Sequence, residues 1–280
     1  MRSENADKTY SEILASFVEG LTFGDIPDDV VAETKLHILD TLGVALASHG
    51  MDFSKILQDF ARGLGGPPES TVVGTGDRLP AHYASLVNAT MVHGRDFDDM
   101  HREGSIHLSA LVVPSALAVA EASGASGEAA MVGMVAGYEV GARIGNAACR
   151  KLLDRGWHPT GIFGAFTSAA TAGKILGSTA GQIATAIGIA GSQCSGSAQW
   201  LEEDSWTKRI HPGWASHSGI LAAKLGQKGY NAPRKIFEGG KGIYRSYLNE
   251  GEFDLYKITK ELGEKWETRE ICYKIYPSGY

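Results

Sequence analysis

The feature that most constrains the fold of this chain is a series of segments in which apolar and small residues recur at helical spacing. Short polar turns separate them, and they predict helices at 11–21, 27–49, 79–95, 108–124, 127–153, 160–177, 179–193 and 214–229. Only residues 70–74 have the pattern of a short strand, and the strand–helix alternation of a parallel α/β sheet is missing. The chain is therefore expected to be mainly all-α.

Glycine is abundant in these segments. The chain has 36 glycines and only 9 prolines, and most glycines stand beside alanines inside helical patterns. Neither the GxGxxG nor the GxxxxGK[ST] phosphate-loop motif occurs in a suitable context. We therefore expect the glycines to allow close packing of helices.

Composition and charge exclude several classes of partner. The net charge is −6 without a long basic block, so nucleic acid is not expected to bind. No stretch approaches the roughly 20 apolar residues of a membrane span, and the polar N-terminus is unlike a signal peptide. The three cysteines form no CxxC pair, which argues against a disulfide framework or a structural zinc site and favours a cytoplasmic location.

The last residues differ from the helical remainder. Residues 268–280 have the pattern of an extended strand for which no partner is evident. We expect an all-helical domain over 1–265, followed at 266–280 by the start of a second, truncated domain.

Acidic residues and histidines are concentrated at 94–109, in the segment GRDFDDMHREGSIHLS. From the residues alone this segment could supply metal ligands, supply acid–base groups, or form an ordinary solvated loop. A metal site from Asp96, Asp98, His101 and His107 would match neither the HExxH motif nor an EF-hand loop, so no metal is expected.

Four further polar segments interrupt the apolar background. They are GWHPTGIFG (156–164), GSQCSG (191–196), SWTKRIHPGWASHSG (205–219) and YKIYPSGY (273–280). His158 precedes a helix that is predicted to open at Thr160, and a helix N-terminus favours a neutral ring and attracts anions. A satisfied core histidine is the alternative there, and a surface basic patch is the alternative around Lys208.

Taken together and in this order, HGRDFDD, GWHPTG, GSQCSG, WTKRIHPGWASHSG and KIYPS resemble the MmgE/PrpD family over nearly the whole chain. The resemblance implies a large helical domain, a smaller α/β lid domain of which this chain has only the first strand, a homodimer, and a site without metal or other cofactor.

The resemblance also implies the site residues. Asp96, His107, His158, Lys208 and Lys274 match the family's catalytic positions. Substrate-binding positions are expected at Met100, His101, Thr160, Gln193 and Ser278. Met100 stands where some relatives have a threonine near the substrate.

These residue types suit a small polycarboxylate substrate. Two lysines can hold carboxylates and stabilise an enolate-like charge, and a histidine can move a proton at the carbon next to a carboxylate. We expect first a hydro-lyase that dehydrates a 2-methylcitrate-like acid. Decarboxylation of a cis-aconitate-like acid and epimerisation of an iminodisuccinate-like acid are alternatives, because all three build similar charge.

The sequence also leaves open a function of another class, one without catalysis. Without the rest of a lid domain, one wall of the site would be missing and water would enter it. The chain would then be a catalytically inactive truncated paralogue or a carboxylate-binding protein.

Overall fold

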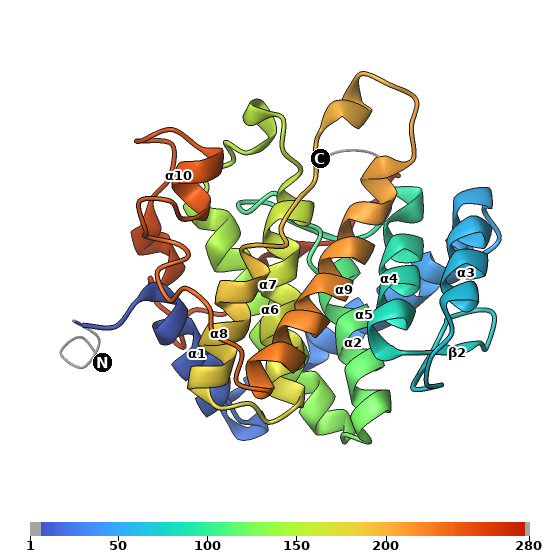
Figure 1. The fold of residues 1–280 in the computed structure, drawn as a ribbon, viewed down its shortest axis with the longest axis horizontal. Helices are drawn as coiled ribbons and strands as arrows, with labels where there is room; N and C mark the ends of the chain where they lie inside the picture. Colours follow the sequence, from blue (N-terminus) through green and yellow to red (C-terminus); the bar gives the residue numbers. More distant parts are fainter. Residues whose placement is uncertain (1–6, 278–280) are drawn as a thin grey trace.

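The computed structural model describes residues 7–277, and these form a mainly helical bundle (Figure 1). The expectation of an all-α chain is confirmed. The helices are α1 Tyr10–Gly20, α2 Asp28–Ser48, α3 Asp52–Leu64, α4 Ala81–Val92, α5 Ser109–Ser123, α6 Gly127–Ala147, α7 Pro159–Ile175, α8 Ala180–Ala190, α9 Thr207–Gln227 and α10 Ile243–Tyr247. Short 3-10 turns lie at Phe23–Asp25, His93–Arg95, Leu153–Arg155, Gln199–Leu201, Leu255–Ile258 and Glu267–Glu270.

Helix α7 forms the centre of the bundle. It packs most extensively against α9 and α6, and α8 covers the remaining side between α9 and α1 (Figure 1). Nearly every residue of α7 is buried, including Phe163 and Phe166. A helix that is apolar all round must be enclosed on all sides, and this explains its weak amphipathic pattern.

A stripe of glycines lets α6 approach its neighbours. Gly133, Gly137, Gly141 and Gly145 recur every four residues and therefore share one face of the helix. A Cβ atom at each position would overlap side chains of α7 or of the segment before α5. The predicted role of glycine in close helix packing is confirmed for this helix.

Replacement of Gly137 by alanine is expected to destabilise the protein by about 1–3 kcal/mol, because the added methyl would overlap Thr171. Gly127→Ala is the matched control on the same helix, since a Cβ there meets nothing within 4 Å. Urea unfolding of both variants measures the difference. Equal stability of the two would show that the stripe is not a packing constraint.

Helix α3 was missed by the sequence analysis. It buries Phe53, Leu57 and Ala61 at a spacing of four, although Ile56 and Phe60 on its other faces are exposed. Apolar residues on several faces weakened the periodic signal. With α2, α4 and the β1–β2 hairpin, α3 encloses a second, smaller apolar cluster at one edge of the bundle (Figure 1).

Two small antiparallel sheets are present in the described part of the chain. Strand β1 Ser70–Thr71 pairs with β2 Arg78–Leu79, so the strand predicted at 70–74 exists in shortened form. Strand β3 Met100–His101 pairs with β4 Ile271–Cys272. The expectation that the C-terminal strand lacks a partner is therefore wrong. Met100 pairs with Cys272, and His101 pairs with Ile271.

Helix α9 begins at Thr207, seven residues before the predicted start at residue 214. Pro212 and Gly213 lie in its second turn, and such residues normally argue against a helix interior. Pro212 has no backbone N–H, so the hydrogen bond to the Lys208 carbonyl four residues before it is not made. Lys208 and His211 are thus fixed on the first turns of a helix.

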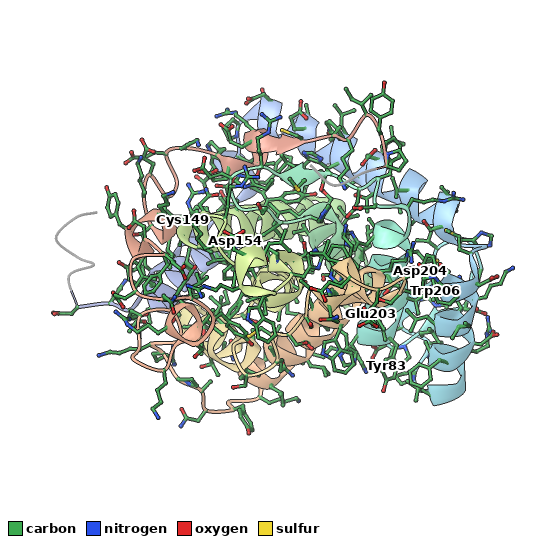
Figure 2. The ribbon with its side chains drawn as sticks, turned by 90° about the horizontal axis from the view of Figure 1, so that it is seen from above. Tyr83, Cys149, Asp154, Glu203, Asp204 and Trp206 are labelled. Carbon is green, nitrogen blue, oxygen red and sulfur yellow. The ribbon has the colours of Figure 1, made fainter. Side chains whose placement is uncertain are left out.

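The connections before α7 and α9 meet where Trp157 forms a bridge with Ser197, and their other parts diverge. Cys149 and Asp154, before α7, are well separated from Glu203, Asp204 and Trp206, before α9 (Figure 2). Among the described residues, no helix is both long and apolar enough to cross a membrane.

Candidate active site

Asp96 joins two lysines from distant parts of the chain. Its carboxylate accepts a hydrogen bond from Lys208 Nζ at 2.7 Å through one oxygen and from Lys274 Nζ at 2.8 Å through the other. Lys274 Nζ also donates to the backbone carbonyl of Asp96 at 2.9 Å. Asp96 ends the turn His93–Arg95 with a left-handed backbone (φ 53°), which aspartate tolerates better than most residues.

The charges around Asp96 leave this group positive. Burial alone would raise the pKa of Asp96, but the hydrogen bonds and charges of Lys208 and Lys274 hold it well below its usual range. One ionised carboxylate then faces two cationic groups. The surplus charge favours binding of an anion, and the bridge fixes where both ammonium groups lie.

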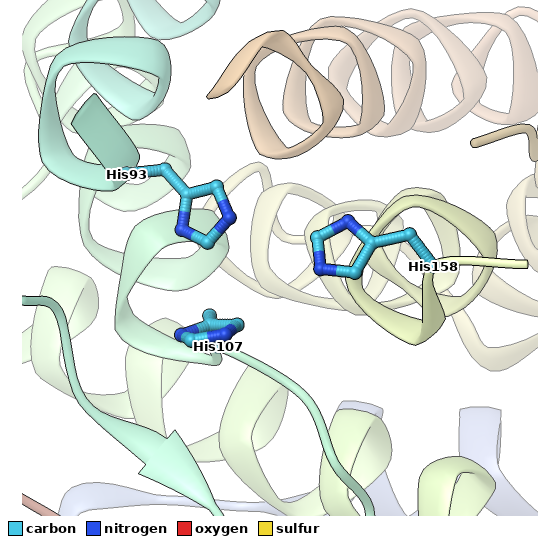
Figure 3. Close-up of side chains that lie close together, drawn as sticks. All are labelled: His93, His107 and His158. Atoms are coloured by element: carbon cyan, nitrogen blue, oxygen red, sulfur yellow. The ribbon is translucent and has the colours of Figure 1, made fainter. Parts of the chain in front are cut away.

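Three buried histidines stand beside this group. His93 ends α4, His107 precedes α5, and His158 caps α7 (Figure 3). The ring centroids of His93 and His107 are 4.6 Å apart, and those of His93 and His158 are 5.6 Å apart. Potential ligand atoms of His93, Asp96, Asp98 and His107 lie within 4.8 Å of one another. The lysine–aspartate group and the histidines therefore form one site.

Each histidine has a partner on its outer side. His93 Nδ1 lies 2.8 Å from Asp98 Oδ2, and His107 Nδ1 lies 3.0 Å from the backbone oxygen of Asp99. His158 Nδ1 lies 3.0 Å from His211 Nδ1, so one of those nitrogens donates and the other accepts. Oxygen acceptors fix the proton of His93 and of His107 on Nδ1, which leaves each Nε2 as a free acceptor.

Burial keeps His93 and His158 uncharged. It lowers the pKa of His158 well below its usual range, and the neighbouring histidines lower it further. Burial also lowers the pKa of His93, by more than the nearby Asp98 raises it. Neutral rings can accept a proton from a substrate carbon or return one to it.

The local sequence explains the position of His158. Pro159 occupies the first position of α7, where its fixed φ suits a helix start and its missing N–H costs nothing. The backbone N–H of His158 donates to Gly196 O at 2.8 Å. The predicted position of His158 just before a helix is confirmed, although the helix begins at Pro159, one residue before the predicted start at Thr160.

Trp200 connects the two halves of the site. Lys208 Nζ lies 4.8 Å from the centre of its ring, and the His158 ring lies 5.8 Å away at a steep angle. On the outer side of the His158–His211 pair is a pocket of about 300 Å³. It is lined by Ser195, Gly196, Ser197, Ile210, His211 and Trp214.

The structure brings together the five residues predicted to be catalytic: Asp96, His107, His158, Lys208 and Lys274. Thr160 belongs to the same region, because its hydroxyl accepts the backbone N–H of His107 at 3.2 Å. Their catalytic roles stay a prediction.

The predicted substrate-binding residues are placed less uniformly. Met100 lies buried on β3, and Gln193, just after α8, has a buried amide oxygen without a hydrogen-bond partner among the described residues. Both nitrogens of His101 are engaged, one with Glu267 at 3.1 Å and the other with the Gly104 N–H at 3.0 Å. Those contacts give His101 a structural role in this arrangement. Ser278 lies outside the described residues.

The sequence analysis missed three members of the site. His93 and Asp98 stand in the HGRDFDD segment, and His211 stands in WTKRIHPG, but none was singled out as catalytic or substrate-binding. The sequence signal that could have found His93 is its position three residues before Asp96, because one short helical turn brings the two residues close together. Its neighbours could be known only once α4 and α5 were in place.

A buried polar network attaches the segment that carries Lys274. Glu139 on α6 accepts hydrogen bonds from the backbone N–H groups of Glu267 and Thr268 and from the Thr268 hydroxyl. Arg143, one turn later, donates to Glu139 at 2.8 Å. Together with the β3–β4 pairing, these hydrogen bonds hold Lys274 next to Asp96.

Glu267 in this network makes stability depend on pH. Burial raises its pKa, but His101, Arg143 and Lys265 outweigh that effect and lower it from 4.5 to about 2. Because the folded-state pKa is the lower one, the carboxylate contributes stability above about pH 4.5 that is lost as the pH falls towards 2.

We expect Glu267→Gln to lower the free energy of unfolding by about 2–3 kcal/mol at neutral pH, and by progressively less in acid. Urea unfolding from neutral pH down to about pH 3 measures the trend. The exposed Glu264→Gln serves as control. If the difference in free energy of unfolding between the wild type and Glu267→Gln did not shrink as the pH falls, the lowered pKa of Glu267 would be contradicted.

Comparison with known proteins identifies the family of the chain. Residues 12–256 match the family model of the MmgE/PrpD N-terminal domain. The chain is 28% identical to a cis-aconitate decarboxylase of Aspergillus terreus, over 97% of this chain and 58% of that protein. Cis-aconitate decarboxylases of Mus musculus and Homo sapiens are 30% and 28% identical over 97% of this chain, covering 56% and 57% of their own lengths.

The chain thus spans less than three fifths of the length of these curated relatives. The family match, in contrast, extends over most of this chain. On that match, the chain belongs to the MmgE/PrpD family.

Proposed function

We propose that this chain is a lyase that acts on a small di- or tricarboxylate, and that it decarboxylates a cis-aconitate-like acid. The observation that carries the proposal is the pair of lysines, Lys208 and Lys274, bridged by Asp96 beside three buried histidines. A polycarboxylate is the substrate class that needs several fixed cations and a proton carrier that is neutral before reaction.

Lys208 and Lys274 would hold the substrate's carboxylates. Their ammonium groups already lie within hydrogen-bond distance of the Asp96 carboxylate, so a substrate carboxylate can share the same donors. Because the carboxylate bridge fixes the lysines before substrate binds, little side-chain entropy is lost when the complex forms.

The reaction breaks the bond between the substrate carbon and its departing carboxylate, and CO₂ leaves. The remaining electron pair spreads through the adjacent double bond to a neighbouring carboxylate, where the lysines stabilise the added negative charge. The proton that completes the product comes from water: a histidine of the site takes it up and delivers it to the far carbon of the former double bond, and the double bond then lies at the carbon that lost CO₂. His107 and His158 fit this step because both rings stand beside the lysine–aspartate group.

Decarboxylation is preferred here to the dehydration that the sequence analysis put first. The relatives with curated names are cis-aconitate decarboxylases, and breaking a carbon–carbon bond would make the chain a carbon–carbon lyase and not a hydro-lyase. Dehydration of a 2-methylcitrate-like acid and epimerisation of an iminodisuccinate-like acid are the competing reactions, which the same residues could catalyse.

The experiment is an incubation of the purified 280-residue chain in D₂O with cis-aconitate, 2-methylcitrate, citrate and iminodisuccinate, followed by proton NMR. Decarboxylation yields itaconate that carries one deuterium. New vinyl signals from 2-methylcitrate would instead assign dehydration, and loss of an α-proton signal alone would assign epimerisation.

Absence of turnover with every compound, in a chain shown to be folded by circular dichroism, would contradict the lyase proposal. Thermal stabilisation by a polycarboxylate without turnover would contradict it too, and would identify a carboxylate-binding protein. The homodimer that the resemblance implies and the cytoplasmic location that the cysteines favour stay predictions, which light scattering and cell fractionation test.

A further inference from the structure

The three histidines of the site share a feature that a proton carrier alone does not require. His93 is 1% exposed, and its Nε2 atom has no hydrogen-bond partner among the described residues. One potential ligand atom from each of His93, His107 and His158 lies within 4.8 Å of the other two. Figure 3 shows the three rings grouped around a common space, from three separate segments.

The outer partners of the rings match those of metal-binding histidines. Such histidines usually donate their second N–H to a carboxylate or a backbone carbonyl, and this orients the ring and strengthens the ligand. Asp98 has that relation to His93, and the backbone oxygen of Asp99 has it to His107. His158 has a hydrogen-bonding partner in His211.

From this arrangement we infer that His93, His107 and His158 form a binding site for one divalent transition-metal ion of the Zn²⁺ class. Imidazole ligands favour Zn²⁺, Cu²⁺, Ni²⁺ or Co²⁺ over Mg²⁺ and Ca²⁺, which prefer oxygen. The site would have three protein ligands and one open position, which water or a carboxylate can fill.

The geometry requires only local adjustment. Tetrahedral zinc with Zn–N bonds of about 2.0–2.1 Å needs ligand nitrogens about 3.4 Å apart. The ligand atoms here lie within 4.8 Å of one another, so the rings must close by about 1.4 Å at most along each edge. Rotation about the side-chain bonds can supply this, because each ring comes from the end of a helix or from a loop and not from a helix interior.

Such an ion would act as an inhibitor and not as a cofactor, and this consequence rests on the proposed function. It would occupy the ring nitrogens that the reaction needs for proton transfer. It would also add two positive charges next to Lys208, so the site would change from a proton-transfer site to a metal centre with one open position.

The test is a titration of the metal-free chain with Co²⁺, whose visible ligand-field bands report tetrahedral coordination, followed by displacement with Zn²⁺. We expect one equivalent of Co²⁺ to bind the wild-type chain. Asp98→Asn should weaken binding by about 10–100-fold through loss of the outer partner. His93→Gln and His158→Gln should weaken it at least as much.

The matched control is the double variant His82→Gln/His217→Gln. These two histidines form a separate pair, with ring centroids 5.2 Å apart, and they take no part in the site. The control is expected to bind Co²⁺ like the wild type. Circular dichroism and thermal melting verify that every variant is folded, and Zn²⁺ is expected to raise the melting temperature of the wild type but not of His93→Gln.

The inference fails if the wild type gives no tetrahedral Co²⁺ bands. It also fails if His93→Gln binds as well as the wild type, or if only the His82→Gln/His217→Gln control loses the ion. The titration contains no substrate, so its result is independent of the lyase assay. A chain that binds Co²⁺ but turns over no polycarboxylate would refute the proposed function alone.

Discussion

Replacement of Lys208 by alanine is expected to lower kcat/KM for the polycarboxylate substrate by about 10²–10³-fold, the effect of losing one charged donor to a developing oxyanion. Lys208 Nζ donates to Asp96 at 2.7 Å and lies over the Trp200 ring. Its loss removes one of two cations and frees Asp96 to move. Product formation followed by proton NMR measures the change.

Lys224→Ala is the matched control, because Lys224 lies on the same helix and its amine is 3.6 Å from the surface residue Glu69. This variant is expected to retain wild-type kcat/KM. If Lys208→Ala were as active as Lys224→Ala, the lysine–aspartate group would not be where the substrate reacts. A rise in KM with unchanged kcat would limit Lys208 to substrate binding.

Replacement of Arg143 by methionine is expected to reduce the free energy of unfolding by about 3–5 kcal/mol, as when one partner of a buried ion pair is removed. Arg143 is 1% exposed and donates to Glu139 at 2.8 Å. It also donates to the backbone oxygens of Glu261 and Lys265. Methionine fills a similar volume but removes the buried positive charge that faces Glu139, whose remaining donors are neutral groups of Glu267 and Thr268. Guanidinium unfolding measures the loss.

The control for Arg143 is Arg155→Met, which breaks a solvent-exposed pair with Glu252 at 2.6 Å. Exposed pairs contribute about 1 kcal/mol or less, so the two arginines should differ several-fold in their effect. A loss at Arg143 no larger than that at Arg155 would show that the buried network contributes little. Because the network holds the segment of Lys274, we also expect Arg143→Met to weaken substrate binding.

The helical character of the chain could be predicted because the buried residues of a helix recur with a regular period that is visible in the sequence. In segments 127–153 and 160–177 apolar and small residues recur at helical spacing, and both segments form helices. The second has nearly the predicted bounds, whereas the first ends at Ala147, six residues before its predicted end. Prediction failed where the local signal conflicted with the packing. Helix α3 exposes large apolar residues, and the start of α9 contains Pro212.

The candidate site could be predicted only in part. Motif resemblance pointed to Asp96, Lys208 and Lys274, which the structure joins. It also placed His101 at the substrate, a role that stays a prediction, and in the structure that ring contacts Glu267. His93 was overlooked although it lies closer to the centre of the site.

The sequence by itself determined which segments are helical, which faces they can bury, and which polar residue types are present. Only the tertiary structure decided which of those residues meet. Asp96 lies 112 residues from Lys208 and 178 residues from Lys274 along the chain. No local periodicity specifies a contact over such distances. The contact arises because burial of the helix faces, close approach at the glycines of α6 and the Glu139–Arg143 network fix three remote segments at one place.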